Sequence, residues 1–172
     1  MMKRSTGSFL LLAAALTGCV AASQYSGDGR LVDNGAGAAT DRYVLDLGAI
    51  SLTNPGSTTY TLAGLPSTDF VVGIELRGSA SNVESGSINP TVAMVLTDGS
   101  KTVMSKKASL RDWTWSIHAP GNYAFVYGRE QASTNFTPSP GKRYKLTVTT
   151  EQPDRSAVNY QAALVAKSAG WK

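Results

Sequence analysis

From Tyr43 onward, apolar and polar residues alternate in short runs, and this alternation constrains the fold more than any other feature. Residues 70–77 place Phe, Val, Ile and Leu at every second position, and residues 144–149 repeat the pattern. Successive side chains of a strand point to opposite faces, so this period predicts half-buried strands. Further strands are expected at residues 43–52, 58–62, 92–96, 101–106, 113–117, 123–127 and 158–166. The last run is Ala-rich and is also compatible with a helix.

Turn signals separate these runs. Pro and Gly fall at residues 54–56, 65–66, 119–121 and 138–141. Asp98-Gly99 predicts a two-residue hairpin, because both residue types tolerate positive φ. Eight or nine short strands at this spacing favour an all-β fold, an antiparallel two-sheet β-sandwich.

One local resemblance supports a sandwich. The stretch PGKRYKLTV, residues 140–148, is similar to the Pro-Gly-x-x-Tyr-x-apolar-x-Val segment of fibronectin type III domains. In that family the tyrosine ties a loop to its strand, so the resemblance implies this role for Tyr144. The family's early core tryptophan has no counterpart, because Trp113 and Trp115 come mid-chain.

The first 19 residues have the layout of a bacterial export signal. Lys3 and Arg4 precede an apolar run at residues 9–16, which is shorter than the roughly 20 residues of a membrane-spanning helix. The run leads into LTGC, residues 16–19, which resembles the lipobox of bacterial lipoproteins. In that family the cysteine receives a diacylglycerol, the signal is cut before it, and the new amino group is acylated, for example with palmitate. The resemblance implies lipidation of Cys19, the only cysteine.

This resemblance divides the chain into three parts. We expect a signal peptide at residues 1–18, a lipid-anchored flexible tether at 19–41 and a β-sandwich domain at 42–172. The tether is rich in Ala, Gly, Ser and Asp, which bury too little surface to offset their ordering entropy. As a coil its mean reach is roughly 25 Å. Val20, rather than Asp, follows the cysteine, and the family's sorting rule then favours the outer membrane, with the domain in the periplasm.

Composition excludes several classes of protein. Removing residues 1–18 takes Lys3 and Arg4 from the 16 basic residues, which leaves 14 against 12 acidic ones. No Lys/Arg stripe or binding motif predicts a nucleic-acid partner. A single cysteine allows no internal disulfide, but a domain of this length buries about two-thirds of its unfolded surface.

We expect no enzyme, metal or cofactor. His118, the only histidine, precedes a Pro-Gly turn and is expected on a solvated loop, and no serine lies in a G-x-S-x-G motif. A zinc site needs three or four ligands, and residues 28–35 lack the ligand spacing and closing Glu of a calcium loop. A glycosidase could use two carboxylates, but the sequence pairs none of the candidates Asp69, Glu75, Asp112 and Glu130.

The stretch RDWTWSIH, residues 111–118, is the most suggestive one for binding. Trp113 and Trp115 are two apart and would share one face of a strand. If exposed, they form with Arg111 a stacking platform for sugars or an anchor for a protein partner. If buried, they belong to the core, and we favour this alternative because tryptophan is highly buried on average.

Lys101, Lys106, Lys107 and Arg111 lie within eleven residues. They would contact anionic lipid or protect an edge strand from pairing with another chain, and we favour the edge strand. The expected partners are the membrane, through Cys19, and an envelope protein. We therefore expect a non-catalytic protein-interaction module, of the accessory or immunity type. The alternative is a carbohydrate- or cell-wall-binding module that uses the two tryptophans.

Overall fold

The computed structural model describes residues 25–33, 43–78, 88–118, 123–128 and 135–168, with only the backbone for residues 33, 77–78, 114–118 and 123–128. Within these ranges the chain forms eleven strands and two short 3-10 helices. The strands are β1 (Arg30–Asp33), β2 (Tyr43–Ile50), β3 (Gly56–Ala63), β4 (Phe70–Gly78), β5 (Thr91–Asp98), β6 (Lys101–Ser109), β7 (Trp113–His118), β8 (Tyr123–Gly128), β9 (Asn135–Phe136), β10 (Arg143–Gln152) and β11 (Tyr160–Ser168). The 3-10 helices are η2 (Leu110–Asp112) and η3 (Arg155–Asn159).

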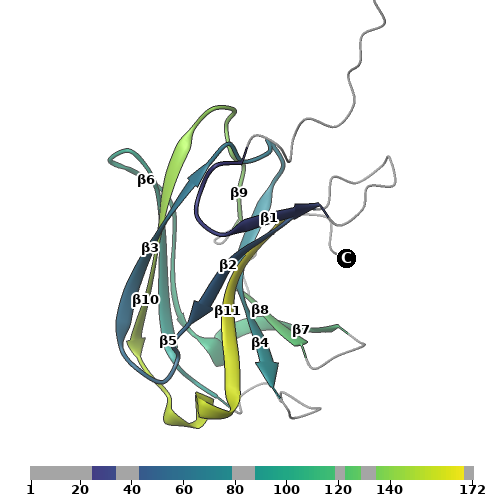
Figure 1. Ribbon diagram of the computed structural model, residues 1–172. Helices are drawn as coiled ribbons and strands as arrows, with labels where there is room; N and C mark the ends of the chain where they lie inside the picture. The colour runs from purple at the N-terminus through teal and green to yellow at the C-terminus, as the bar shows by residue number, and fades with distance from the viewer. Residues whose placement is uncertain (1–24, 34–42, 79–87, 119–122, 129–134, 169–172) are drawn as a thin grey trace, which may run out of the picture.

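The strands form two antiparallel sheets that pack face to face, which confirms the predicted β-sandwich (Figure 1). One sheet has the order β1-β2-β11-β4-β8-β7, with β9 also paired to β4. The other has the order β3-β10-β5-β6. Every strand expected from the alternation is present, whereas the short strands β1 and β9 were not predicted.

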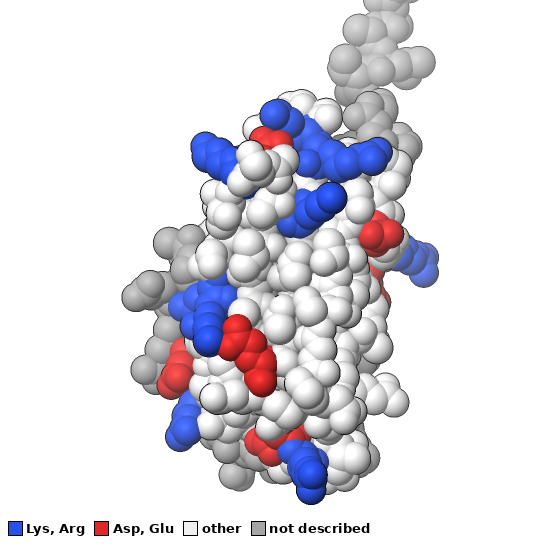
Figure 2. All heavy atoms as spheres, turned by 90° about the vertical axis from the view of Figure 1, so that its left-hand side faces the viewer, with Lys and Arg blue, Asp and Glu red and all other residues white. Residues whose placement is uncertain are grey.

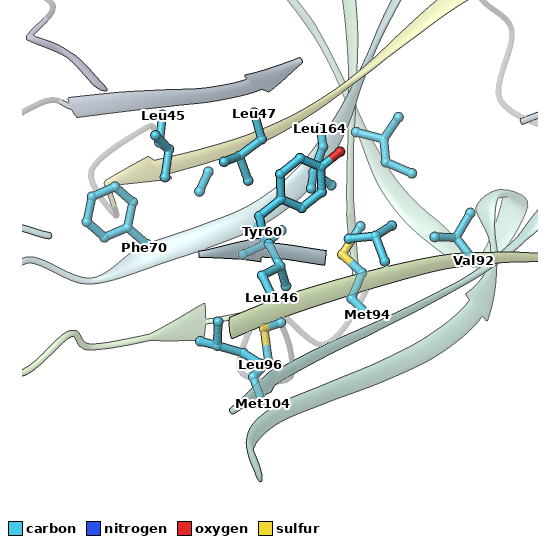
Figure 3. Close-up of a cluster of buried hydrophobic side chains, with 14 of the residues drawn as sticks. Leu45, Leu47, Tyr60, Phe70, Val92, Met94, Leu96, Met104, Leu146 and Leu164 are labelled. Atoms are coloured by element: carbon cyan, nitrogen blue, oxygen red, sulfur yellow. The ribbon is translucent and has the colours of Figure 1, made fainter. Parts of the chain in front are cut away.

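The core lies between the two sheets and follows from the alternation. Every second side chain of β4, β5 and β10 points inward, and Phe70, Met94 and Leu146 are among them. Figure 3 shows these side chains meeting between the sheets. Burying each one contributes roughly 1.5–3 kcal/mol, and this apolar layer holds the fold without a disulfide.

The Ala-rich run near the C-terminus is a strand, so the helix alternative is wrong. β11 pairs with β2 on one side and β4 on the other. Two ladders satisfy its backbone, and small residues such as Ala163 suit a strand covered on both faces. The residues just before it form η3, where the Asp154 side chain accepts a hydrogen bond from Ser156 N–H at 2.9 Å.

The turn chemistry was predicted to within one residue. β5 and β6 form a hairpin in which Asp98 pairs with Lys101, so its two turn residues are Gly99 and Ser100. Gly99 has φ +59, the conformation that this turn requires. At the start of β10, the hydroxyl of buried Tyr144 accepts a hydrogen bond from Ser139 N–H at 2.8 Å and so ties the preceding loop to its strand. The resemblance to fibronectin type III domains stays a prediction.

The N-terminal segment, residues 25–33, belongs to the folded domain, so the tether prediction is wrong for these residues. β1 pairs with β2 in the seven-stranded sheet. The residues just before it bind β3 of the other sheet: Ser26 N–H donates to Ala63 C=O at 3.0 Å, and Asp28 N–H donates to Thr61 C=O at 2.7 Å. The Asp28 carboxylate in turn accepts from Thr61 N–H at 2.6 Å. The segment therefore joins the two sheets.

Glycine is required at two positions of the N-terminal segment. A Cβ at Gly27 would lie 2.4 Å from Thr61 C=O. At Gly29, with φ +79, it would lie 2.3 Å from Asp46 C=O. A Cβ cannot approach a backbone oxygen so closely, so only glycine fits at these two positions. The glycines that gave this segment the composition of a linker are therefore required for its packing.

Candidate functional site

The stretch that carries Arg111, Trp113 and Trp115 places its first tryptophan in the core. Arg111 is exposed in η2, but Trp113, the first residue of β7, is only 2% exposed. η2 takes the chain from the four-stranded to the seven-stranded sheet and buries Leu110, so Trp113 enters between the sheets. A stacking platform that includes Trp113 is therefore wrong. The Trp115 backbone pairs with Val126, and its side chain lies outside the described residues.

The candidate catalytic groups are not brought together. Asp69 precedes β4 and is exposed, Asp112 is exposed in η2, and Glu75 is buried in β4. Glu130 lies outside the described residues, as does Cys19. In the described ranges, no three His, Cys, Asp or Glu side chains cluster as metal ligands would. The His118 backbone ends β7 rather than lying on a loop.

Two buried ionisable side chains lie on the outer side of the seven-stranded sheet. Glu75 in β4 is 8% exposed and Lys167 in β11 is 5% exposed. Burial lowers the pKa of Lys167 to about 8, and the negative charge of Glu75 opposes this shift. Both side chains have interaction partners, and we interpret them as structural. The alternation in β4 predicted a solvated outer face, which is wrong here because Val71 is buried there as well.

The lysines of β6 lie on an edge strand, as their positions predicted. Lys107 Nζ lies 2.5 Å from Glu151 Oε2 of β10, and Lys106 is half-buried. Lys101 stands at the hairpin end of β6, whereas Arg111 follows its other end. These four basic residues therefore do not form one patch.

The outer face of the four-stranded sheet is largely uncharged over its two central rows, where the one charged side chain is Lys107 on the edge strand β6, opposite Ala93. Cross-strand pairs join hydroxyls there: Ser57 Oγ lies 3.0 Å from Thr149 Oγ1, and Thr59 Oγ1 lies 3.0 Å from Thr147 Oγ1. We call this surface the uncharged face. Its side chains, all exposed or half-exposed, are those of Ser57, Thr59, Thr91, Ala93, Val95, Ser105, Thr147 and Thr149. Figure 2 shows it as a broad area without Lys, Arg, Asp or Glu.

Basic side chains gather at one end of the same sheet, seen at the top of Figure 2. We call the exposed residues Lys101, Lys142, Arg143 and Lys145 the basic end. Lys142 Nζ lies 3.2 Å from Asp98 Oδ2. Among the described residues, no salt bridge engages the other three. Three members of the basic end lie at residues 142–145, and the hairpin between β5 and β6 brings Lys101, about 40 residues earlier in the chain, to the same end of the sheet.

No protein-family model matches the chain, and no curated protein sequence is significantly similar to it. Across the described ranges, no helix has the length and apolar character needed to cross a bilayer. The function must therefore be argued from the surfaces of this chain.

Proposed function

We propose that the protein is a lipoprotein, anchored in the outer membrane through Cys19, whose sandwich binds another protein in the periplasm without catalysing a reaction. The observation that carries the proposal is the uncharged face. The export-signal layout and the LTGC motif support the anchor. Small lipoproteins with a sandwich domain often serve as accessory subunits of envelope assemblies or as immunity proteins, and we propose a role of this type.

The uncharged face has the chemistry of the centre of a protein interface. Charged residues are depleted at such centres. The β-branched side chains, such as Thr147 and Val95, have few rotamers and lose little entropy when a partner covers them. The four strands of this face span roughly 400 Å², about half of what one partner contributes to a stable complex. The Lys107–Glu151 pair reaches across β5 next to Ala93, and it would then belong to the polar rim at that end of the face.

The carbohydrate-binding alternative is less well supported. It required Trp113 and Trp115 to stack against sugars, and Trp113 lies in the core. The uncharged face also presents no described aromatic side chain on which a sugar ring could stack.

A pull-down with matched variants tests the proposal. The bait is the chain from Val20 to Lys172, because the N-terminal segment is part of the fold, and the prey is a native envelope extract. Val95→Arg places a long charged side chain at the centre of the face. Val158→Arg makes the same change in η3, where Val158 is 73% exposed. We expect a stoichiometric protein partner that Val95→Arg loses and Val158→Arg keeps.

Two results would overturn the proposal. One is that no protein is retained, or that both variants retain the same protein equally. The other is enrichment of cell-wall fragments without a protein, which would support the carbohydrate-binding alternative.

A further inference from the structure

We propose that the basic end docks on the anionic phospholipid surface of the membrane that holds the lipid anchor. The sandwich then stands with this end on the headgroups and its opposite end toward the periplasm. This inference rests on the proposed anchor at Cys19, and it adds an orientation and a second membrane contact.

The first observation is the short connection between anchor and fold. Only five residues, 20–24, separate Cys19 from Tyr25, the first residue of the N-terminal segment described above. Fully extended, this connection spans at most about 20 Å. The expected tether of 19–41 would have let the domain tumble freely, but a connection of this length keeps one end of the domain at the membrane.

The second observation is that the basic end is the end held there. Ser26 N–H donates to Ala63 C=O, and Ala63 pairs directly with Arg143. Ser26, Lys142 and Arg143 also line one hollow of about 470 Å³, together with small residues such as Gly64. The point where the chain leaves the fold and two cations of the basic end thus border the same depression, into which a phosphate headgroup can enter.

The third observation is the charge asymmetry along the sheet. Lys101, Arg143 and Lys145 are exposed and lack a salt bridge among the described residues. The described acidic residues of this end of the sheet are Asp98, which engages Lys142, and Asp28, whose carboxylate accepts from Thr61 N–H, so the cations outnumber them. At the opposite end, Arg111 is followed directly by Asp112. There Arg155 likewise follows Asp154, and Glu151 engages Lys107.

The ten residues of β10 separate the two ends by about 30 Å. This separation exceeds the Debye length of about 8 Å at physiological salt. When the basic end lies on the headgroups, the negative surface potential of the lipids therefore acts on the charges of that end and not on those of the opposite end.

Binding to vesicles measures this contact without the anchor. The probe is the chain from residue 19 to 172 with Cys19→Ser, which carries no acyl group, and the vesicles are phosphatidylcholine with and without phosphatidylglycerol. Each Lys or Arg near an anionic surface strengthens binding about fivefold at low salt. The three unpaired cations predict about 100-fold stronger binding to the anionic vesicles, and added salt weakens it.

Two double variants with equal net charge locate the contact. Arg143→Gln with Lys145→Gln should weaken binding to anionic vesicles about 25-fold. Arg111→Gln with Arg155→Gln removes the same charge from the opposite end and should leave binding unchanged.

Equal binding to both vesicle types would overturn the proposal. An equal loss in both double variants would also overturn it, because net charge alone would then explain the binding. A separate measurement in cells tests the anchor itself. If Cys19 is not lipidated, Cys19→Ser will leave the protein in the same cell fraction and will not change its mass.

Discussion

Gly29→Ala should release the N-terminal segment from the sandwich, and Gly48→Ala supplies its control. Both glycines have positive φ, +79 at Gly29 and +91 at Gly48. They differ in what a new methyl group meets. At Gly29 a Cβ would lie 2.3 Å from Asp46 C=O and 3.0 Å from Leu47 Cα, whereas at Gly48 nothing lies within 4 Å.

The magnitude follows from this difference. The backbone conformation alone should cost about 1–2 kcal/mol for alanine at either position. At Gly29 the new Cβ would also lie about 1 Å closer to the Asp46 carbonyl oxygen than an ordinary van der Waals contact allows. The backbone of β2 is held in the sheet and cannot move away, so the N-terminal segment must move instead. The segment then leaves β3, with loss of the two backbone hydrogen bonds and the one from Thr61 N–H to Asp28. At about 1 kcal/mol each, these add roughly 2–3 kcal/mol to the cost of Gly29→Ala.

Urea unfolding followed by tryptophan fluorescence measures the two free energies of unfolding. Amide hydrogen exchange adds a local measurement, because Thr61 N–H should lose protection in Gly29→Ala while Leu146 N–H at the centre of the sheet stays protected. If both variants are destabilised equally and Thr61 remains protected, the segment does not pack as described.

Three further predictions follow from other parts of the molecule. Cys19→Ser should move the protein from the membrane to the soluble fraction and remove the acyl mass, and an unchanged mass and fraction would contradict the anchor. Leu146→Ala, at 0% exposure, should lower the free energy of unfolding by about 2–5 kcal/mol, whereas its neighbour Thr147→Ala should cost less than about 1 kcal/mol. Stability should rise between about pH 8 and pH 10, because the unfolded Lys167 binds a proton that the folded one has released. In Lys167→Met this rise should be smaller, and urea titrations across that range give the comparison.

The strands were predictable because their signal is local. Alternation in residues 70–77 and 144–149 needs no knowledge of partners, and the turn at Gly99 is encoded by the residues that form it. The core was therefore predictable too, since its members are the apolar half of each run. The order of the strands in the two sheets was not, because it depends on pairings between distant segments such as β11 with β2.

The errors share a different cause. The Gly and Asp residues of the N-terminal segment have the composition of a linker, yet their partners, Thr61 and Ala63, lie more than 30 residues away. Glu75 and Val71 are buried on the outer side of β4, which depends on contacts with other parts of the chain that the alternation within β4 does not report. The basic end likewise combines residues 142–145 with the distant Lys101, so no continuous stretch of sequence displays the whole group.

The N-terminal segment has a consequence for self-association. β3 is the last strand of its sheet, and Ser26 and Asp28 occupy the backbone groups of Ala63 and Thr61 that would otherwise face outward. A domain boundary placed by composition at residue 42 would remove this cover. The shortened chain would keep its core but present an open row of hydrogen-bonding groups, to which β3 of a second copy could add as a neighbouring strand. Nine residues that resemble a linker thus cover an edge to which a second copy could otherwise pair.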